Sequence, residues 1–306
     1  TAMTGFYGTI RGIQNMLQEV ISIDQAMTEL KRVMDATPKQ YNEMLQQSIE
    51  LSKQLGNNVH DVLDSLTEVA RSYGDTLSQA DMLKLTKTSI LASNVSDLSP
   101  AQAMSDMIGV MNAYKISAQD SIQIIDKLNE VDNNYSVSTQ QIADAMQKSA
   151  SVAKVYGVSL DELIGNITAI GSTTQESGEQ IGRALKTIYS RITTLGQAKD
   201  ALDSVGVSIY DMNNQVKPVS TILDELAKKW KGLSDEQRQN VAVNVAGRDQ
   251  LTRFLALMEN WNMSINATKT SLNSAGSAMQ ENEKYLNSAQ ARINELKTAF
   301  TELSLP

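Results

Sequence analysis

The chain has 306 residues, enough for two domains of ordinary size or for one array of stacked helices. Its 27 basic and 35 acidic side chains give a net charge of −8, so the chain as a whole repels nucleic acid and anionic membrane surfaces. It has no cysteine and a single histidine, His60, which excludes disulfide frameworks, zinc–thiolate sites, thiol nucleophiles and sites with two histidine ligands.

The composition is typical of a helical protein, because the chain has only four prolines and three phenylalanines. Several helix starts carry a serine or threonine followed three residues later by Gln, Glu or Asp, which is the pattern of a capping box. These pairs are Thr37 and Gln40, Ser99 and Gln102, Ser117 and Asp120, Ser138 and Gln141, Ser159 and Glu162, and Ser234 and Gln237. In chain order we expect helices over residues 8–35, 38–55, 59–73, 77–93, 100–114, 118–134, 139–156, 160–171, 179–195, 219–231, 235–246 and 249–303.

One strand signal interrupts the helices. Apolar and polar residues alternate over 205–210 and again over 215–217, and they flank Asn213 and Asn214, which tolerate the positive φ of a tight turn. The expected fold is therefore all-α, with short helical hairpins followed by a small β-hairpin insertion and a long C-terminal coiled-coil-like helix. The expected regions are residues 1–204 with helical hairpins, 205–248 with the β-hairpin and short helices, and 249–306 with the long helix.

The most regular pattern lies at the C-terminus, where apolar residues recur alternately every three and four positions. A seam this long favours a coiled coil or a helical stalk, because a helix that faces a core has a wider stripe and ends sooner. Asn282 is expected to be a buried polar residue that fixes register and strand number. The alternative is a long helix that packs on its own chain. The seam positions expected to mediate self-association in a small homo-oligomer are Leu251, Phe254, Met258, Trp261, Ile265, Leu272, Met279, Asn282, Leu286, Ile293, Leu296, Phe300 and Leu303.

Residues 182–199 form a positive island on an acidic chain, because they contain basic side chains and no acidic one. The basic residues are Arg183, Lys186, Arg191 and Lys199. Such an island can meet an acidic partner or a passing nucleic-acid backbone. It can also be a solvated helix face near a helix C-terminus, where the helix dipole favours positive charge.

We expect no catalytic, cofactor-binding or metal-binding residues. The adjacent carboxylates Asp161 with Glu162 and Asp224 with Glu225 point to different faces of a helix, so neither pair converges on a substrate. The glycines of the middle region form no phosphate-binding motif. No apolar run reaches the roughly 18 residues of a membrane-spanning helix, so no membrane segment is expected.

Three segments resemble the core region of phage tail tape measure proteins, and they follow one another in the same order. They are residues 156–165 (YGVSLDELIG), 179–192 (EQIGRALKTIYSRI) and 217–249, which runs from KPVSTILDEL through LSDEQ to VAGRD. The resemblance implies a non-enzymatic structural protein of the virion tail, which sets tail length, nucleates tail tube assembly and leaves ahead of the DNA. It places the protein in the tail lumen or tip, and in the host cytoplasm during assembly.

The partners that the resemblance implies are tail tube proteins, tail tip or distal tail proteins and tail assembly chaperones, with transient contact with phage DNA. Family members are often much longer and carry further modules. Because the chain also begins without Met and ends directly after a helical pattern, we expect a piece of a longer protein.

A rival interpretation rests on Trp230-Lys231-Gly232, a W-x-G turn between two helices. It resembles small secreted bacterial helical-hairpin proteins and the helical targeting domains of bacterial toxins. Those proteins need a long helix on each side of the turn, whereas Pro218 and Gly247 limit both helices of this chain. This interpretation remains the alternative to a tail protein.

Overall fold

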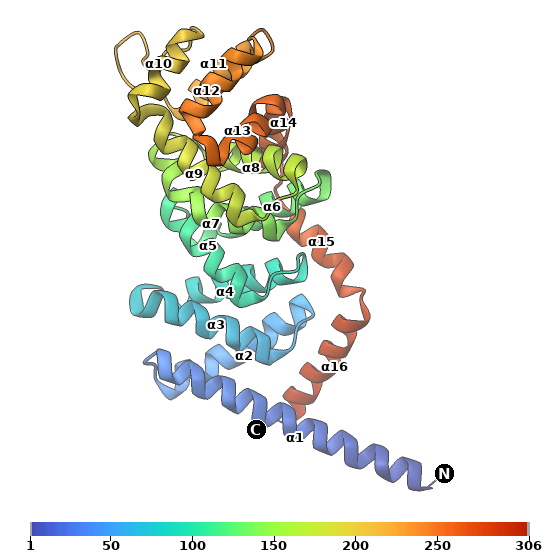
Figure 1. The fold of residues 1–306 in the computed structure, drawn as a ribbon. Helices are drawn as coiled ribbons and strands as arrows, with labels where there is room; N and C mark the ends of the chain where they lie inside the picture. The colour runs from blue at the N-terminus through green and yellow to red at the C-terminus, as the bar shows by residue number, and fades with distance from the viewer. Residues whose placement is uncertain (1, 305–306) are drawn as a thin grey trace. The chain divides into compact units, whose positions relative to one another are not determined.

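The computed structural model describes the backbone of residues 2–304 and the side chains of residues 14, 17–74, 76–288, 290–299 and 301–302. Within this part of the chain there are sixteen α-helices and three short 3₁₀ helices (Figure 1). The expected all-α class is therefore confirmed.

The chain forms two compact units. Unit 1 comprises Thr1–Ser105, Ala118–Ile125 and Ala278–Pro306, and unit 2 comprises Asp106–Ser117 and Asp126–Ser277. The region boundaries expected at residues 204 and 248 both fall inside unit 2.

Unit 1 has its apolar core between its N-terminal helices. Its helices are α1 (Ala2–Val33), α2 (Pro38–Leu55), α3 (Val59–Tyr73), η1 (Gly74–Thr76), α4 (Gln79–Asn94), the start of α5 (Pro100–Tyr114), η2 (Ala118–Asp120), the start of α6 (Ile122–Asn134), α15 (Ser277–Leu286) from its second residue, and α16 (Ala289–Ser304). The side chains of Leu30, Leu63, Leu66, Leu85 and Ile90 have no exposed surface. Because they come from α1, α3 and α4, these three helices hold the unit together.

Unit 2 contains the rest of α5 and α6 and a further set of helices. These are α7 (Thr139–Val155), α8 (Leu160–Thr174), α9 (Gly178–Thr194), α10 (Gly196–Ser204), α11 (Val219–Trp230), α12 (Asp235–Ala246), η3 (Arg248–Gln250), α13 (Leu251–Glu259) and α14 (Trp261–Leu272). Its core includes Ile164, Ile167, Leu185, Ile188 and Leu257, all fully buried. The sequence did not indicate α10 as a separate helix.

Serine and threonine caps set many of the helix starts in both units. Thr37, Ser138, Ser159 and Ser234 each form a full capping box, in which the cap side chain and the side chain three residues on each satisfy a free backbone N–H. Ser99 accepts a hydrogen bond of 3.2 Å from the backbone N–H three residues later. The predicted cap residues thus fix these helix starts as expected.

Glycines allow two helix pairs of unit 2 to approach closely. Gly178 and Gly182 lie one turn apart on α9, and a Cβ at either position would collide with a backbone carbonyl of α7. A Cβ on Gly165 of α8 would lie 2.5 Å from the carbonyl oxygen of Ser264 in α14. In both helix pairs the two backbones therefore touch directly, because glycine has no side chain to hold them apart.

The β-hairpin expected near residue 213 is not formed as strands. The chain does turn back there, with Asn214 at φ 58°, but only Tyr210 and Val216 form an isolated antiparallel bridge. The carboxylate of Asp211 accepts hydrogen bonds from two backbone N–H groups, including that of Gln215 at 2.9 Å. This side chain holds the turn in place of a strand ladder.

The single long helix expected over 249–303 is wrong, because η3 and the four helices α13 to α16 occupy this segment. An asparagine stands at each break between the α-helices: Asn260, Asn273 and Asn287. Each side chain donates to the backbone carbonyl four residues earlier, at 2.9, 3.0 and 2.9 Å. At Asn260 and Asn273 the same carbonyl also accepts from the asparagine's own backbone N–H, so the side chain adds a local hydrogen bond that favours ending the helix there, and the apolar heptads do not override it.

Candidate functional site

The expected seam residues are distributed between the interiors and the surfaces of the two units. Phe254 and Met258 are buried, Leu251, Trp261, Ile265, Met279 and Leu286 are half-buried, and Leu272, Ile293 and Leu296 are exposed. The side chains of Phe300 and Leu303 lie outside the described residues. The described seam residues of each unit thus differ in burial, and the breaks between the helices interrupt the heptad pattern.

Phe254 lies in the core of unit 2, where its ring meets Trp230. The ring centroids are 5.9 Å apart and the planes meet at 81°, an edge-to-face aromatic pair. Trp230 is only 2% exposed. The tryptophan of the W-x-G turn therefore serves as a core residue of unit 2.

Asn282 is buried as expected, and its partners lie in the same chain. Its side-chain oxygen accepts a hydrogen bond of 2.7 Å from the amide of Asn94. The same amide donates to the side chain of Asn57 and to the carbonyl of Leu55. Within unit 1, Asn282 thus joins a cluster of asparagine amides at the ends of α2 and α4.

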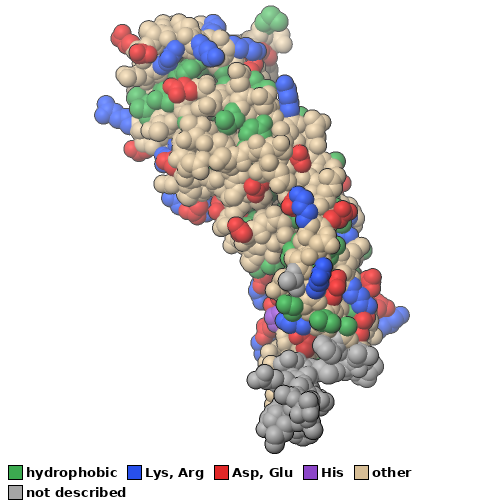
Figure 2. Space-filling model, turned by 90° about the vertical axis from the view of Figure 1, so that its right-hand side faces the viewer, with side chains coloured by type: hydrophobic (Ala, Val, Ile, Leu, Met, Phe, Trp, Pro, Cys, Tyr) green, Lys and Arg blue, Asp and Glu red, His purple; other side chains and the backbone are tan. Residues whose placement is uncertain are grey.

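The basic residues of the expected positive patch are largely engaged within the chain. Arg183 lies 3.2 Å from Glu179, and the ammonium group of Lys199 lies 2.6 Å from Asp203. Lys186 is exposed and has no hydrogen bond or ion pair to any residue that the structure describes. On the face shown in Figure 2, Lys and Arg side chains lie near Asp and Glu side chains, and most of the surface carries neither. The local excess of positive charge is therefore small.

Arg191, also a residue of the expected positive patch, forms a contact between two helices. Its guanidinium donates to the carbonyl oxygens of Val245 and Asn244 at 3.1 and 3.3 Å. These carbonyls belong to the last turn of α12, where the helix itself offers them no partner. Arg191 therefore links the end of α12 to α9.

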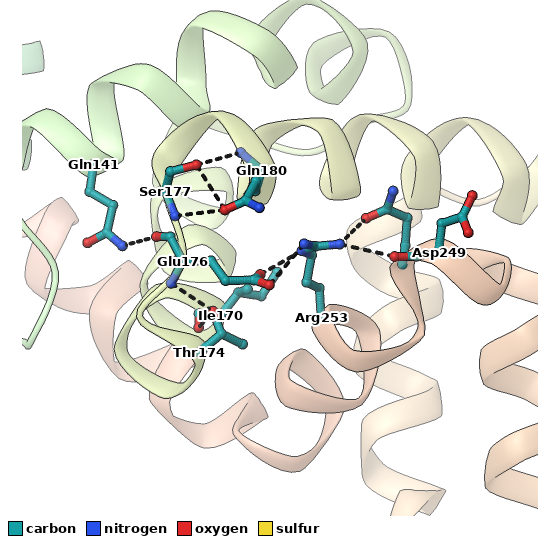
Figure 3. A network of polar contacts seen from close by, with 9 residues as sticks. Gln141, Ile170, Thr174, Glu176, Ser177, Gln180, Asp249 and Arg253 are labelled. Carbon is teal, nitrogen blue, oxygen red and sulfur yellow. Dashed lines mark hydrogen bonds and ion pairs between the residues drawn. The ribbon is translucent and has the colours of Figure 1, made fainter.

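A denser polar network surrounds the turn between α8 and α9 (Figure 3). Arg253 on α13 contacts both carboxylate oxygens of Glu176, at 2.6 and 2.9 Å, in a bidentate ion pair. Its remaining guanidinium nitrogen donates to the carbonyl of Asp249 and the side chain of Gln250, at 3.0 and 2.9 Å. Gln141 on α7 donates to the backbone carbonyl of Glu176. The α8–α9 turn is thus fixed to both α7 and α13.

Ser177, the residue after Glu176, caps the start of α9 with a capping box that was not among the expected ones. The Ser177 side chain accepts from the backbone of Gln180, whose side chain accepts from the backbone of Ser177. The S-x-x-Q signature of this cap, Ser177 and Gln180, is nevertheless present in the sequence. The pair of Glu176 and Arg253 carries no such signal, since the two residues are 77 positions apart.

The Glu176–Arg253 pair gives a first prediction. Replacing Arg253 by Gln should lower the free energy of unfolding of unit 2 by about 2 kcal/mol, because it leaves a carboxylate with little exposure and no cation. Both side chains of the pair are less than a third exposed, at 16% and 27%. Urea unfolding followed by tryptophan fluorescence measures the change, since both tryptophans lie in unit 2.

The matched control is Arg183→Gln, which removes an ion pair with side chains 67% and 50% exposed. It should change stability by less than about 0.5 kcal/mol. Equal effects of the two substitutions would contradict the structural role of Arg253.

A buried hydrogen-bond chain crosses the core of unit 2. Asn166 donates to the hydroxyl of Tyr189 at 2.7 Å and accepts from Ser264 at 2.8 Å. Burial raises the pKa of the Tyr189 phenol above its ordinary range, so the hydroxyl stays neutral. These buried polar groups therefore have hydrogen-bond partners in one another, and such a network favours a single packing arrangement of α8, α9 and α14.

An acidic hollow of about 410 Å³ lies in unit 1. It is lined among others by Glu29, Asp61, Asp64 and Glu68. Burial raises the pKa of both Asp61 and Asp64. Among the described residues, no group of His, Asp or Glu side chains is placed to hold a metal ion.

None of the described helices combines the length and the apolar character needed to cross a bilayer.

Comparison with known proteins places these helices in a family. Residues 45–247, about two thirds of the chain, match the family described as phage-related minor tail protein. The chain is also 27% identical over 130 residues to the tape measure protein of Pneumococcus phage Dp-1. That alignment covers 42% of this chain and 11% of the relative, so the chain spans a small part of the length of that protein. No solved structure matches the chain.

The family match extends from within α2 to the end of α12, and it contains the resembling segments at 156–165 and 179–192. It also contains the close helix pair of α7 and α9 and the capped turn at Ser177. The chain therefore belongs to the phage-related minor tail protein family and is a tape measure-like protein of the phage tail.

Proposed function

We propose that this chain is part of a tape measure protein, a structural component that sets the length of the phage tail and nucleates assembly of the tail tube. The observation that carries the proposal is the family match over residues 45–247. The polar network at the α8–α9 turn agrees with it, because its side chains bind one another and the backbone within the fold. In this proposal the chain has no catalytic role.

The proposed location is the virion tail, in its lumen or at its tip, after assembly in the host cytoplasm. The proposed partners are tail tube proteins, tail tip or distal tail proteins and tail assembly chaperones. The net charge of −8 supports departure ahead of the genome, since an acidic protein and DNA repel each other and contact between them is transient.

Self-association of copies belongs to the same proposal. Of the seam residues, Ile293 and Leu296 on α16 are 48% and 62% exposed, and they lie three positions apart on one helix face. Exposed apolar side chains at helical spacing are suited to contact the same stripe of a second copy.

A tape measure inside a narrow tail tube requires these compact units to open into an extended chain. Each helix keeps its backbone hydrogen bonds when contacts between helices open, and the capping boxes of α2, α7 and α8 keep those helix starts satisfied without a neighbour. An extended helical chain then contributes about 1.5 Å of tail length per residue.

Tail length is the test. Deleting Asn273 to Leu286 removes two heptads, so tails should be shorter by about 21 Å on electron micrographs. The control replaces the same residues by an equally long helix-forming sequence, which should leave tail length unchanged. Full-length tails from the deletion would contradict a ruler role for this segment.

A further inference from the structure

The C-terminal part of unit 1 packs with its polar side inward. We name residues 278–304, which comprise α15 from its second residue and α16, the strap. Among the described side chains of α16, Ala291, Asn294, Thr298 and Thr301 are buried. Of the large apolar side chains of this helix, the two that the structure describes, Ile293 and Leu296, are exposed. A helix that docks through the hydrophobic effect has the opposite arrangement.

Hydrogen bonds between amides and hydroxyls hold the strap to α2 and to the residues that follow it. Asn294 donates to the carbonyl oxygen of Gly56 at 2.9 Å, and the hydroxyls of Ser52 and Thr298 are 3.1 Å apart. At the other end of the strap, Asn282 accepts from Asn94 at 2.7 Å. These hydrogen bonds therefore locate the strap on α2, on the residues that follow α2 and on the end of α4.

These contacts are only partly satisfied. The side-chain nitrogen of Asn282 is buried and has no hydrogen-bond acceptor among the described residues. The ion pair between Lys53 and Glu302 is 42% exposed on both sides, so water screens it. A polar contact exchanged for contact with water contributes little net stability, and a buried donor without an acceptor opposes docking.

The rest of unit 1 does not depend on the strap for its core. Leu30, Leu63, Leu66 and Leu85 are fully buried and come from α1, α3 and α4. Among its described side chains, the strap contributes Met279, Tyr285 and Leu286, which are only half-buried, and small residues such as Ala291. Removing the strap would thus leave the large apolar side chains of the core in contact.

We propose that the strap is a releasable element of unit 1. Unit 1 has a docked state and an open state, in which the strap leaves as one piece while α1, α3 and α4 stay packed. Release exposes the groove between Ser52, Asn57 and Asn94, whose polar groups water can satisfy. It also exposes the polar face of α16. Opening therefore hydrates polar groups on both surfaces and lets the C-terminal segment move without unfolding the unit.

Hydrogen exchange on the complete chain, read by mass spectrometry, tests this proposal. Once released, helices as short as α15 and α16 are marginal in water, so their amides exchange in the open state. Strap amides should exchange at least 100-fold faster than those of α3 and α4, and at one common rate along the strap. Exchange of the strap at the rate of α3 and α4 would overturn the proposal, and so would a strap without any protection.

A reversible cross-link distinguishes release of the strap as one piece from general mobility of unit 1. The chain has no cysteine, so Ser52→Cys with Thr298→Cys can form only one disulfide. Oxidation should slow strap exchange to the rate of the core, and reduction should restore the fast rate. The matched control joins the hydrogen-bonded hydroxyl positions of α3 and α4, with Ser65→Cys and Ser89→Cys. That disulfide should leave strap exchange unchanged, and an equal slowing by both cross-links would refute release as a unit.

A single substitution provides a second readout. Asn94→Ala removes the donor to Asn282 and should accelerate strap exchange at least tenfold, with circular dichroism and the exchange of α3 unchanged. Strap exchange at the unaltered rate in this variant would show that the amide cluster does not hold the strap.

Discussion

Alanine at position 182 should lower the free energy of unfolding of unit 2 by about 3 kcal/mol. The added Cβ would lie 2.9 Å from the Cα of Ala145 and would collide with the carbonyl oxygen of the same residue. Because both obstacles belong to the backbone of α7, no side-chain rotation can relieve them, and α7 and α9 must move apart. Urea unfolding followed by tryptophan fluorescence measures the loss.

Gly109→Ala is the matched control, since Gly109 also lies inside a helix of unit 2. A Cβ at this position meets nothing within 4 Å. Alanine should therefore stabilise α5 by about 0.5 to 1 kcal/mol through its better helix propensity. If both substitutions changed stability in the same direction, the close approach of α7 and α9 would not be the reason for glycine at position 182.

Phe254→Ala should be equally disruptive, with a loss of about 3 to 5 kcal/mol. Phe254 has no exposed surface, and its truncation leaves a cavity beside Trp230 in the core of unit 2. Circular dichroism during thermal unfolding is the measurement, because fluorescence responds directly to a change next to a tryptophan.

Leu296→Ala is the companion substitution, at an exposed position of the same heptad seam. It should change stability by less than about 0.5 kcal/mol. In the proposed self-association, light scattering should show a smaller average mass for this variant than for the parent chain at equal concentration. A Phe254→Ala protein that stays fully stable and only loses mass would instead assign Phe254 to an interface between copies.

Local signals in the sequence were sufficient for most helix starts. Ser138 and Ser234 begin α7 and α12 at the expected residues, because a cap depends only on side chains within one helical turn. The cap at Ser177 follows the same rule. The helices between residues 38 and 246 could therefore be placed with small errors, apart from α10.

Long-range packing was not predictable by the same means. The heptad seam treats Ser264 and Thr298 as polar surface positions, yet both are buried, with exposures of 3% and 1%. Ser264 faces Gly165 in a helix contact that admits only small residues, and Thr298 meets the hydroxyl of Ser52. Apolar periodicity cannot reveal a contact whose partners are small or polar.

For the candidate site, too, the sequence indicates individual residues but not their contacts. The sequence indicates a positive charge at Arg191 but not that helix α12 ends against it, since its acceptors are more than fifty residues away. The same holds for Arg253 and Glu176. Charge and burial patterns identify which residues are candidates, whereas the tertiary fold decides which of them meet.

The order of synthesis gives the nested connectivity of unit 1 a kinetic consequence. The strap begins at Ala278, and about 150 residues, most of unit 2, separate it from Ile125, the end of the preceding segment of unit 1. At translation rates of about 5 to 20 residues per second, the ribosome needs roughly 8 to 30 s to make the intervening chain. During that interval α1 to α4 can pack, but Asn94 and Ser52 have no strap to bind. Every newly made molecule therefore passes through the open state of unit 1 before it can reach the docked state.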